Sequence, residues 1–540
     1  IVTVDNGVSA IDEAIRAKEL GIDLVVTDHH KVGDALPDAV AVVDPHREDC
    51  PSNFKEMSGV GVAFKLVCAL EGDSGDILIE EYGDLVALGT IGDVVTLTGE
   101  NRVMVKRGIR LINECPRPGI NALMEFAGVA DKIFSASTAA FAVCPRINAA
   151  GRMGSANKAL DLLLCDDDEI ALQIAEEIND LNVIRQQTET LIFAQALSKI
   201  GSDPNLVNDK IIVVDGEDWH QGVIGIVAAR ITERYGRPCI VISRDGEDAR
   251  GSCRSIEGFS IYDAIEAVSD CLDHFGGHTL AAGLGLKSSR IDEFRKRIND
   301  YARDKKMPFA LQKIDCRLQP TSICLDLLAS VNQLEPFGAG NSQPCFGLFG
   351  VKIEDFSAVS EGRHVRMMIS KNYAKTGVVF FGMPEKKFPF SKGDTVDLAV
   401  NLERSVYNRE ARVSIIVRSI RPSSTDEEKV LRATELYEKF VRNEHLTPEE
   451  AQSMIPDRQI EVEVFKSIKA NPLVDKACEV LCMRIGDDGE NLAKICIAVD
   501  MMLEMGVLAA DEIDMVYVPD NPPKVNLENS EIIKRLKSFL

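Results

Sequence analysis

Three short apolar runs near the start of the chain restrict its fold most strongly. Ile1–Val4, Leu24–Val26 and Ala39–Val43 are continuously apolar, and a segment with helical spacing, Ser9–Leu20, separates the first two. Continuous apolar strands joined through helices are typical of a parallel sheet whose faces are both covered. We therefore expect residues 1–45 to form a parallel α/β unit in which all three strands are buried.

Polar side chains follow two of these strands at the point where each strand ends. Asp5 follows the first strand, and Asp28-His29-His30 follows the second. The carboxyl ends of neighbouring parallel strands, about 4.8 Å apart, share one edge of a sheet, which is where ligands bind. Carboxylate and imidazole groups together suit Mn²⁺, Mg²⁺ or Zn²⁺. Either motif alone is more often a turn or a surface feature, but the two together favour a metal site.

A third candidate ligand is Asp93, which follows a predicted helix among small residues in Gly89-Thr90-Ile91-Gly92-Asp93. Small neighbours allow other groups to approach this carboxylate closely. Two divalent ions about 3.5–4 Å apart could then activate a water and stabilise the leaving oxygen of a phosphoester.

The rest of the chain changes character several times. Asp166–Ile200 contains no Gly or Pro and is predicted to be one long helix, or a bent pair, that connects two lobes. A second α/β unit begins at Lys210–Val214. Short β-like runs between 343 and 421 indicate a small barrel. The polar stretch 422–428 resembles a linker, and 429–540 has amphipathic helices with a short strand, which suggests a winged-helix-like domain.

Within the second α/β unit, the pattern predicts a helix over Val223–Tyr235, a strand over Cys239–Ser243 and a further helix over Ser260–Leu272. The unit is expected to extend to about residue 307.

The charge distribution separates two regions. The net charge of the chain is 61 − 85 = −24, which argues against a general nucleic-acid coat. Residues 1–100 have 6 basic and 20 acidic side chains, a net charge of −14, whereas 351–421 have 13 basic and 8 acidic, a net charge of +5. The first region is suited to cations and the second to a polyanion.

Cysteine use and chain ends bear on location. The 14 Cys residues include no Cys-x-x-Cys pair, which indicates reduced thiols in a cytoplasmic protein. The sequence contains no run of 18 apolar residues, so we expect no membrane span. It does not open with a basic-apolar-small leader, so we do not expect secretion. Because the chain starts at Ile1 within an apolar run and without Met, we expect it to be a fragment that lacks its natural N-terminus.

Asp28-His29-His30, in this context, resembles the signature of the DHH phosphoesterase superfamily. Further motifs, in the order of the family, resemble those of the bacterial RecJ single-strand DNA exonucleases and cover about residues 1–421. These motifs are Gly89–Val94, Arg146–Arg152, Trp219–Gly225, Ser252–Ser255, Gly276–His278 and Leu334–Asn341.

The resemblance implies an α/β multidomain architecture. Its expected parts are an incomplete parallel-sheet DHH core (1–165), a long helical connector (166–204), a second α/β DHH-associated lobe (205–307), a connector and OB-fold nucleic-acid-binding barrel (308–425) and a C-terminal helical, winged-helix-like accessory domain (426–540).

The resemblance also implies a site with two Mn²⁺ or Mg²⁺ ions. Asp5 would bridge the ions, and His29 and Asp93 would be ligands. Asp28 and His30 would support the site from close by, with His30 in proton transfer. The first motif of the family, an Asp-x-Asp at the end of an earlier strand, is absent from the sequence, and we expect it upstream of Ile1. The missing carboxylates are expected to leave this fragment with one weakly bound metal, and both an active and an inactive fragment stay open.

Two further sets of residues are implied to bind DNA. The first set would hold the 5′ end and the scissile phosphate, because the guanidinium groups of its arginines pair bidentately with phosphate. It comprises Arg146, Asn148, Arg152, Ser252, Arg254, Ser255, Gly276 and Gly277. His278 would act with it as a proton or hydrogen-bond donor. Lobe–lobe salt bridges are the alternative for Arg146 and Arg152. The second set lies in the barrel and would follow a DNA backbone, with a solvated barrel face as the alternative: Arg363, Arg366, Arg404, Tyr407, Arg409 and Arg412.

The resemblance thus predicts a metal-dependent 5′→3′ exonuclease that acts on single-stranded DNA and releases 5′-mononucleotides in recombination and mismatch repair. Its partners would be a single-strand-binding protein and a RecQ-type helicase. Two alternatives stay open: a phosphodiesterase of the same superfamily that acts on short oligonucleotides or cyclic dinucleotides, and a DNA-binding scaffold without activity. The barrel argues against the former, and the acids and histidines present argue against the latter.

Overall fold

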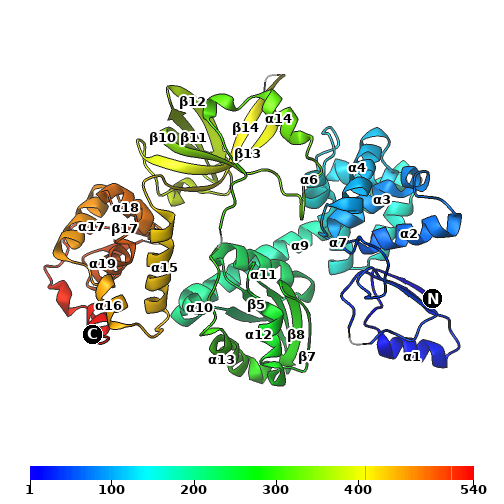
Figure 1. Cartoon of the computed structure of the whole chain (residues 1–540), viewed down its shortest axis with the longest axis horizontal. Helices are drawn as coiled ribbons and strands as arrows, with labels where there is room; N and C mark the ends of the chain where they lie inside the picture. The colour runs from blue at the N-terminus through cyan, green and yellow to red at the C-terminus, as the bar shows by residue number, and fades with distance from the viewer. Residues whose placement is uncertain (34, 310, 408, 512–513) are drawn as a thin grey trace. The chain divides into compact units, whose positions relative to one another are not determined.

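The computed structural model describes residues 1–33, 35–309, 311–407, 409–511 and 514–540, and Figure 1 shows them coloured along the chain. The chain forms two compact units. The first comprises Ile1–Ala310 with Leu334–Gln343, and the second comprises Leu311–Gln333 with Pro344–Leu540. In the described residues, no helix combines the length and the apolar character that crossing a membrane requires.

The first unit begins with a three-stranded parallel sheet in the order β1-β2-β3. Its elements are β1 (Val2–Val4), α1 (Ile11–Glu19), β2 (Val25–Thr27) and β3 (Ala41–Val43). The predicted parallel α/β arrangement is confirmed, but the burial predicted for all three strands is wrong. Only β2 has a neighbour on each side, and its Val26 is fully buried, whereas Val2, Val4 and Val43 of the edge strands are 57%, 47% and 43% exposed.

Helices complete the first lobe around their own apolar core, which includes Ile120, Leu123 and Phe134. They are α2 (Gly59–Glu71), α3 (Leu78–Gly92), α4 (Gly99–Glu114), α5 (Pro118–Phe126), α6 (Ala136–Thr138), a π-helical turn (Ala139–Val143), α7 (Cys144–Met153) and α8 (Asn157–Leu164).

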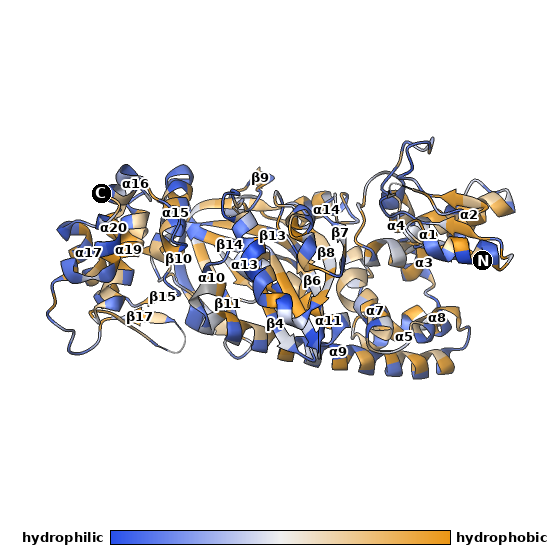
Figure 2. Ribbon diagram, turned by 90° about the horizontal axis from the view of Figure 1, so that it is seen from below, coloured by the Kyte–Doolittle hydropathy of each residue, from blue (hydrophilic) through white to orange (hydrophobic). Residues whose placement is uncertain are grey.

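A single helix, α9 (Asp168–Ser202), is the predicted connector. Its first turn is capped by Asp167, whose carboxylate accepts a hydrogen bond from the Ile170 N–H at 3.0 Å. Ala171 and Ile178 pack into the core of the first lobe, and Ile192 and Ile200 pack into the core of the second. Figure 2 shows hydrophilic and hydrophobic residues alternating along the length of this helix. One uninterrupted helix therefore serves two cores.

The second lobe is a mixed five-stranded sheet in the order β4-β5-β6-β8-β7, in which only β4 and β5 pair in parallel. Its elements are α10 (Pro204–Asn208), β4 (Ile212–Glu217), α11 (Gln221–Tyr235), β5 (Cys239–Asp245), β6 (Asp248–Arg254), α12 (Ile261–Glu266), β7 (His274–His278), β8 (Ala281–Lys287) and α13 (Ile291–Ala302).

Two features of this lobe differ from the sequence prediction. The helix predicted over Ser260–Leu272 ends at Glu266, and a 3₁₀ turn at Ser269–Cys271 follows, because the chain must reverse into β7. The strands β6, β7 and β8 were not predicted. Their glycines and charged side chains weaken the alternation that marks a half-buried strand.

The second unit contains a closed five-stranded barrel. The strands follow the order β11-β12-β14-β13-β10, β10 pairs again with β11, and β12 and β14 run parallel. This is the topology of an OB fold. The interior is filled by fully buried side chains such as Leu348, Met367 and Val400. The elements are β9 (Cys316–Arg317), α14 (Leu325–Asn332), β10 (Phe346–Val359), β11 (His364–Lys371), β12 (Ala374–Phe380), β13 (Thr395–Tyr407) and β14 (Glu410–Pro422).

A helical domain follows, with a small antiparallel sheet in the order β15-β17-β16. The succession of helix, strand, two helices and two strands from α17 to β17 is that of a winged helix, as predicted. The elements are α15 (Glu427–Val441), α16 (Pro448–Met454), α17 (Arg458–Ala470), β15 (Leu473–Val474), α18 (Cys478–Ile485), α19 (Leu492–Glu504), β16 (Ala509–Ala510), β17 (Met515–Tyr517) and α20 (Glu531–Lys537).

Candidate metal centre and phosphate site

Asp5 is held at the carboxyl end of β1 in an unusual backbone conformation. Its φ is +63°, and its N–H donates to the Thr27 carbonyl of the neighbouring strand at 3.0 Å. The carboxylate lies against the start of α2, where a Cβ at Gly59 would come within 2.1 Å of Asp5 Oδ1. A helix N-terminus favours a negative charge at this place. Gly59 is thus required for the Asp5 carboxylate to reach the start of this helix, and it is not among the residues predicted from the sequence.

Asp28 is buried and fully engaged in hydrogen bonds. Its Oδ2 accepts from the Val8 N–H at 2.9 Å, and its Oδ1 accepts from the His29 N–H at 2.8 Å and lies 2.7 Å from His30 Nδ1. Burial alone would raise the pKa of Asp28, but these hydrogen bonds outweigh burial and lower the pKa. Asp28 therefore stays ionised and orients His30, whose Nε2 is left for a ligand or a proton.

His29 places its Nε2 between two carboxylates. The atom lies 3.0 Å from Asp5 Oδ1 and 3.3 Å from Asp93 Oδ2, and the side chain is only 10% exposed. Neither contact has the geometry of a good hydrogen bond, so this buried nitrogen has two ion-pair contacts but no hydrogen-bond partner in the described residues. The Asp5 carboxylate raises the pKa of His29. A buried imidazole nitrogen facing two carboxylates is the arrangement that a divalent cation would satisfy.

Asp93 follows the last turn of α3 and caps that helix. Burial raises the pKa of its carboxyl, an effect that His29 opposes and Asp5 reinforces. The next residue, Val94, has a φ of +62°, which is strained for a β-branched side chain. The carboxylate is thus presented on a sharp, strained turn.

These side chains converge on one point. One ligand atom from each of Asp5, His29 and His30 lies within 4.8 Å of the others, and Asp93 contacts His29 from the opposite side. The sequence prediction gave His30 only a supporting role, whereas its position also allows direct ligation. Two carboxylates and two imidazoles fit Mn²⁺, Mg²⁺ or Zn²⁺.

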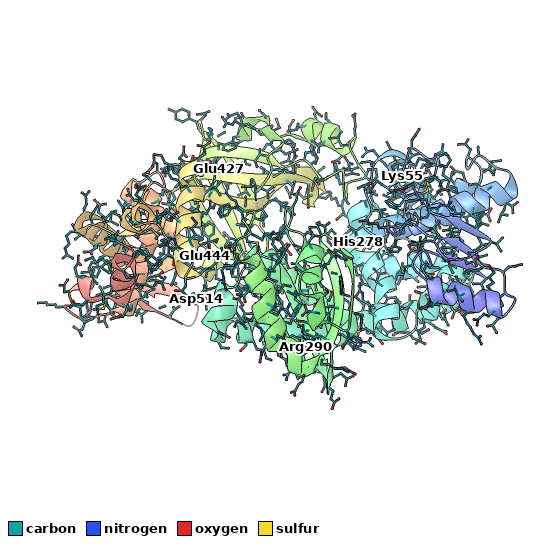
Figure 3. The ribbon with its side chains drawn as sticks, turned by 60° about the horizontal axis from the view of Figure 1, so that its bottom comes forward. Lys55, His278, Arg290, Glu427, Glu444 and Asp514 are labelled. Atoms are coloured by element: carbon teal, nitrogen blue, oxygen red, sulfur yellow. The ribbon has the colours of Figure 1, made fainter. Side chains whose placement is uncertain are left out.

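The imidazoles of this cluster face a cavity of about 1100 Å³ that is also lined by His278 of β7. Figure 3 labels His278 on the second lobe. The preceding Gly277 has a φ of +144°, and a Cβ there would come within 2.5 Å of the Ala281 carbonyl oxygen, so only glycine fits. Gly276, by contrast, has open space on its Cβ side. The two lobes thus contribute histidines to the same cavity.

A second cluster is cationic. Arg152 of α7 donates from Nη1 to the Gly222 carbonyl at 2.9 Å, and Arg254 of β6 donates from Nη1 to Ser252 Oγ at 3.4 Å. Desolvation lowers the pKa of both guanidinium groups, and Arg152 lowers that of Arg254 further. A Cβ at Gly225 would come within 2.9 Å of Ser252 Oγ, so this glycine lets the cluster approach the first turns of α11.

Ion pairing distinguishes these two arginines from others in the lobe. Arg244 and Arg295 both pair with Asp215, and Arg297 pairs with Asp270. No ion pair involves Arg152 or Arg254 within the part of the chain that the structure describes. Two neighbouring guanidinium groups without a carboxylate beside a helix N-terminus are an arrangement that favours an anion, and phosphate binding here stays a prediction.

The remaining predicted phosphate ligands have other surroundings. The Arg146 guanidinium donates to Asn179 Oδ1 and to the carbonyls of Ala142 and Phe126, which favours a structural role. Ser255 Oγ donates to the Phe259 carbonyl at 2.7 Å, and Asn148 is exposed on α7. Phosphate binding by these three residues stays a prediction.

The predicted barrel residues are on the outside of the OB fold. Arg363, Arg366, Arg404, Arg409 and Arg412 are all exposed, whereas the side chain of Tyr407 lies outside the described residues. Arg363 precedes β11, and Arg409 lies in the turn between β13 and β14. These are the two loops through which OB folds bind oligonucleotides. Arg412 pairs with Glu410 at 2.9 Å, so its charge is partly neutralised.

Family models match three parts of the chain. A model of the DHH family, N-terminal domain, matches residues 1–90, one of the DHHA1 domain matches 208–304, and one of the RecJ OB domain matches 314–419. The fold and the site together thus define a DHH-type protein with a DHHA1 domain and an OB domain.

Named relatives place the chain more narrowly. It is 34% identical over 449 residues to the single-stranded-DNA-specific exonuclease RecJ of Salmonella typhimurium, a match that covers 78% of this chain and 77% of that protein. It is also 34% identical to RecJ of Bacillus subtilis over 77% of this chain, but spans only about half (53%) of that relative. The structure of RecJ from Thermus thermophilus in complex with Mn²⁺ superposes with a TM-score of 0.68 at 31% identity, covering 78% of this chain and 61% of that one. The chain belongs to the RecJ family.

Proposed function

We propose that this chain contains part of the active site of a 5′→3′ exonuclease, which in the intact protein hydrolyses single-stranded DNA to 5′-mononucleotides with two divalent metal ions. The observation that supports this most directly is the cavity into which the histidines of the carboxylate–imidazole cluster and His278 of the second lobe all project. Such a cavity offers room for a phosphodiester between a cation site and a hydrogen-bond donor.

In this proposal, Asp5, His29 and Asp93 hold the divalent ions, with Mn²⁺ or Mg²⁺ as the cofactor. When bound, such ions lower the pKa of an attacking water and neutralise charge on the phosphate. Asp28 keeps His30 Nδ1 engaged at 2.7 Å, so that His30 presents Nε2 to the cavity for ligation or proton transfer. Ionised Asp28 thereby acts as a positioning group.

The second cluster would bind the 5′ end of the strand. Arg152 and Arg254, which form no ion pair among the described residues, would bind the terminal phosphate together with Ser252. His278 would donate to the scissile phosphate from the opposite wall of the cavity. Gly277 allows the strand β7 to bring His278 there, because no side chain fits at its position.

The barrel would guide the rest of the strand through the exposed arginines predicted from the sequence, Arg363, Arg366, Arg404, Arg409 and Arg412. The C-terminal domain is a poor candidate for this role. Residues 426–540 have 14 basic and 24 acidic side chains, a net charge of −10. Its helix α19, which stands where winged helices place the helix that reads DNA, buries eight of its thirteen residues, among them Ile495, Val499 and Met502.

Family membership supports three wider assignments, which are also part of the proposal. They are a role in DNA recombination and mismatch repair, action in the cytoplasm, and partnership with a single-strand-binding protein and a RecQ-type helicase.

The experiment is an end-labelling assay. Single strands labelled at the 5′ or at the 3′ end are incubated with Mn²⁺ and either this chain or a chain extended upstream in its natural reading frame, which tests the expected Asp-x-Asp. We expect labelled mononucleotides to appear at once from the 5′ label and only late from the 3′ label. Release from the 3′ end first, or cleavage confined to cyclic dinucleotides, would contradict the proposal, and binding without cleavage by either chain favours a scaffold.

A further inference from the structure

The segment Leu334–Gln343 belongs to the first unit, although the residues on both sides of it belong to the second. We call this segment the strap. In the sequence it stood out only as a motif shared with a family, and neither the metal centre nor the phosphate site uses it. The chain leaves the barrel unit, contacts the first lobe over ten residues and returns.

The strap contacts the connection between α3 and α4, which starts at the metal ligand Asp93. The Leu97 N–H donates to the Ala339 carbonyl of the strap at 2.7 Å. Arg102, in the first turn of α4, donates from Nη2 to the carbonyls of Leu334 and Glu335 at 2.6 and 3.0 Å. The strap is thus tied to this connection through main-chain groups.

Internal hydrogen bonds give the strap a defined shape. Gly338 and Asn341 exchange main-chain hydrogen bonds of 3.0 and 3.1 Å, and Asn341 Nδ2 donates to the carbonyls of Leu334 and Pro336 at 3.0 and 2.7 Å. A Cβ at Gly338 would come within 2.6 Å of Leu97 Cδ1, and Gly340 has a φ of +68°. The glycines of this motif therefore permit the close approach, and its asparagine closes the turn.

The connection that the strap contacts is strained. Val94, directly after Asp93, has a φ of +62°, which a β-branched residue adopts only when its surroundings enforce it. Asn101 also contacts this connection: its Nδ2 donates to the Thr96 carbonyl at 3.0 Å and to the Glu56 carbonyl at 2.6 Å. The strap and Asn101 thus both contact residues that follow Asp93.

We propose that the strap is a positioning element for the metal site: it holds the strained turn that presents the Asp93 carboxylate. The inference rests on the proposed function in one respect, the role of Asp93 as a ligand. It adds that the metal centre depends on the strap, a segment whose sequence neighbours on both sides belong to the second unit. Partners that orient a ligand typically change metal affinity by about 10–100-fold when they are removed.

The test measures metal binding without DNA. Mn²⁺ affinity is determined by calorimetry for the unaltered chain and for Arg102→Gln and Asn341→Ala, which release the strap from α4 and open its turn. We expect each variant to bind Mn²⁺ about tenfold more weakly. In the metal-free chain, hydrogen exchange at the Leu97 amide should become faster in both variants. Arg102→Lys, which keeps a donor, should restore most of the affinity.

Arg107→Gln is the matched control. Arg107 lies on the same helix and only approaches Asp76 at 3.5 Å, so its removal should leave Mn²⁺ affinity and Leu97 exchange unchanged. Unchanged Mn²⁺ affinity in Arg102→Gln and Asn341→Ala overturns the proposal, even if urea unfolds the variants more easily. Loss of Mn²⁺ binding in the control as well would also overturn it. Failure of the proposed function looks different: Mn²⁺ binds and depends on the strap, but no DNA is cleaved.

Discussion

The first unit holds two clusters of opposite charge that form by different structural means. The first lobe brings Asp5, His29 and Asp93 together at the end of a small sheet, around a buried nitrogen that has no hydrogen-bond partner among the described residues. The second cluster forms where Arg152 of α7 meets Arg254 of strand β6 near the start of helix α11, whereas Arg244, Arg295 and Arg297 of the second lobe are paired with acids. Each cluster would be unfavourable alone, since like charges lie close together in partly desolvated surroundings.

The difference indicates what each cluster would bind. The first would be stabilised by a cation and the second by an anion, and in the proposed function a phosphodiester with divalent ions supplies both. The two sheets also differ in burial. The edge strands β1 and β3 expose their valines, whereas strands β4 and β5 of the second lobe bury Val213, Ile240 and Ile242 completely. The candidate phosphate site thus involves the more buried sheet, whereas the candidate metal site depends more on local turns.

The largest effect is expected from His29→Ala. The change removes the imidazole that lies between Asp5 and Asp93, so Mn²⁺ binding and cleavage should both fall at least about 100-fold, since ligand removal exceeds the effect of orienting partners. DNA binding should be nearly unchanged. Calorimetry with Mn²⁺ and a gel-shift assay with single strands measure the two properties separately. Full cleavage activity in the variant would remove His29 from the ligand set.

Arg254→Ala tests the anion site of the second lobe. A hydrogen bond to a charged group contributes about 1.5–3 kcal/mol, so binding of a 5′-phosphorylated strand should weaken about 10–100-fold. Binding of the same strand with a 5′-hydroxyl should change much less. Arg297→Ala is the control, because Arg297 pairs with Asp270 and should not affect either strand. An equal loss for both strands would show that Arg254 does not read the terminal phosphate.

A smaller effect is expected when Arg404, Arg409 and Arg412 of the barrel are all changed to Ala. Binding of long single strands should weaken modestly, and the dependence of log K on log salt should flatten by about 2, or about 0.7 for each lost phosphate contact. Fluorescence titrations between low and high salt measure this slope. If the slope stays the same, the barrel is not the DNA path, and only the two lobes bind the strand.

The smallest effect concerns Asp209, an acid of the second lobe. Burial raises the pKa of Asp209 to about 6, so its charged form is disfavoured in the folded protein. Near pH 4 and below, Asp209 is protonated in the folded protein, and its burial then costs no stability. As the pH rises from about 4 through about 6, the folded protein becomes less stable, because the carboxyl loses its proton more readily in the unfolded chain. Asp209→Asn should therefore unfold at higher urea concentrations at pH 8, by roughly 1 kcal/mol after allowance for partial exposure, and should match the unaltered chain near pH 4. An equal difference at both pH values would contradict this assignment.

Much of the site was predictable because its residues lie at the ends of recognisable elements. Asp5 and Asp28-His29-His30 follow two apolar strands, and parallel pairing of these strands brings them together. The arginines of the second cluster were predicted only from the resemblance, and their phosphate role stays a prediction. Strand β6 has Arg250, Gly251 and Arg254 in place of an apolar alternation. It pairs with β5 through a tight turn and with β8, which is distant in sequence.

The sequence by itself determined the parallel order of the first strands, the connector helix, the barrel and the residue types of both charged clusters, because each depends on local periodicity or on a motif. Only the tertiary structure decided which donors stay free. It showed that Arg146 is occupied by carbonyls while Arg152 and Arg254 form no ion pair in the described residues, that Gly59 admits Asp5 to the start of α2, and that a strap distant in sequence contacts the connection that follows Asp93. These outcomes depend on contacts between segments far apart in the chain, which no local pattern encodes.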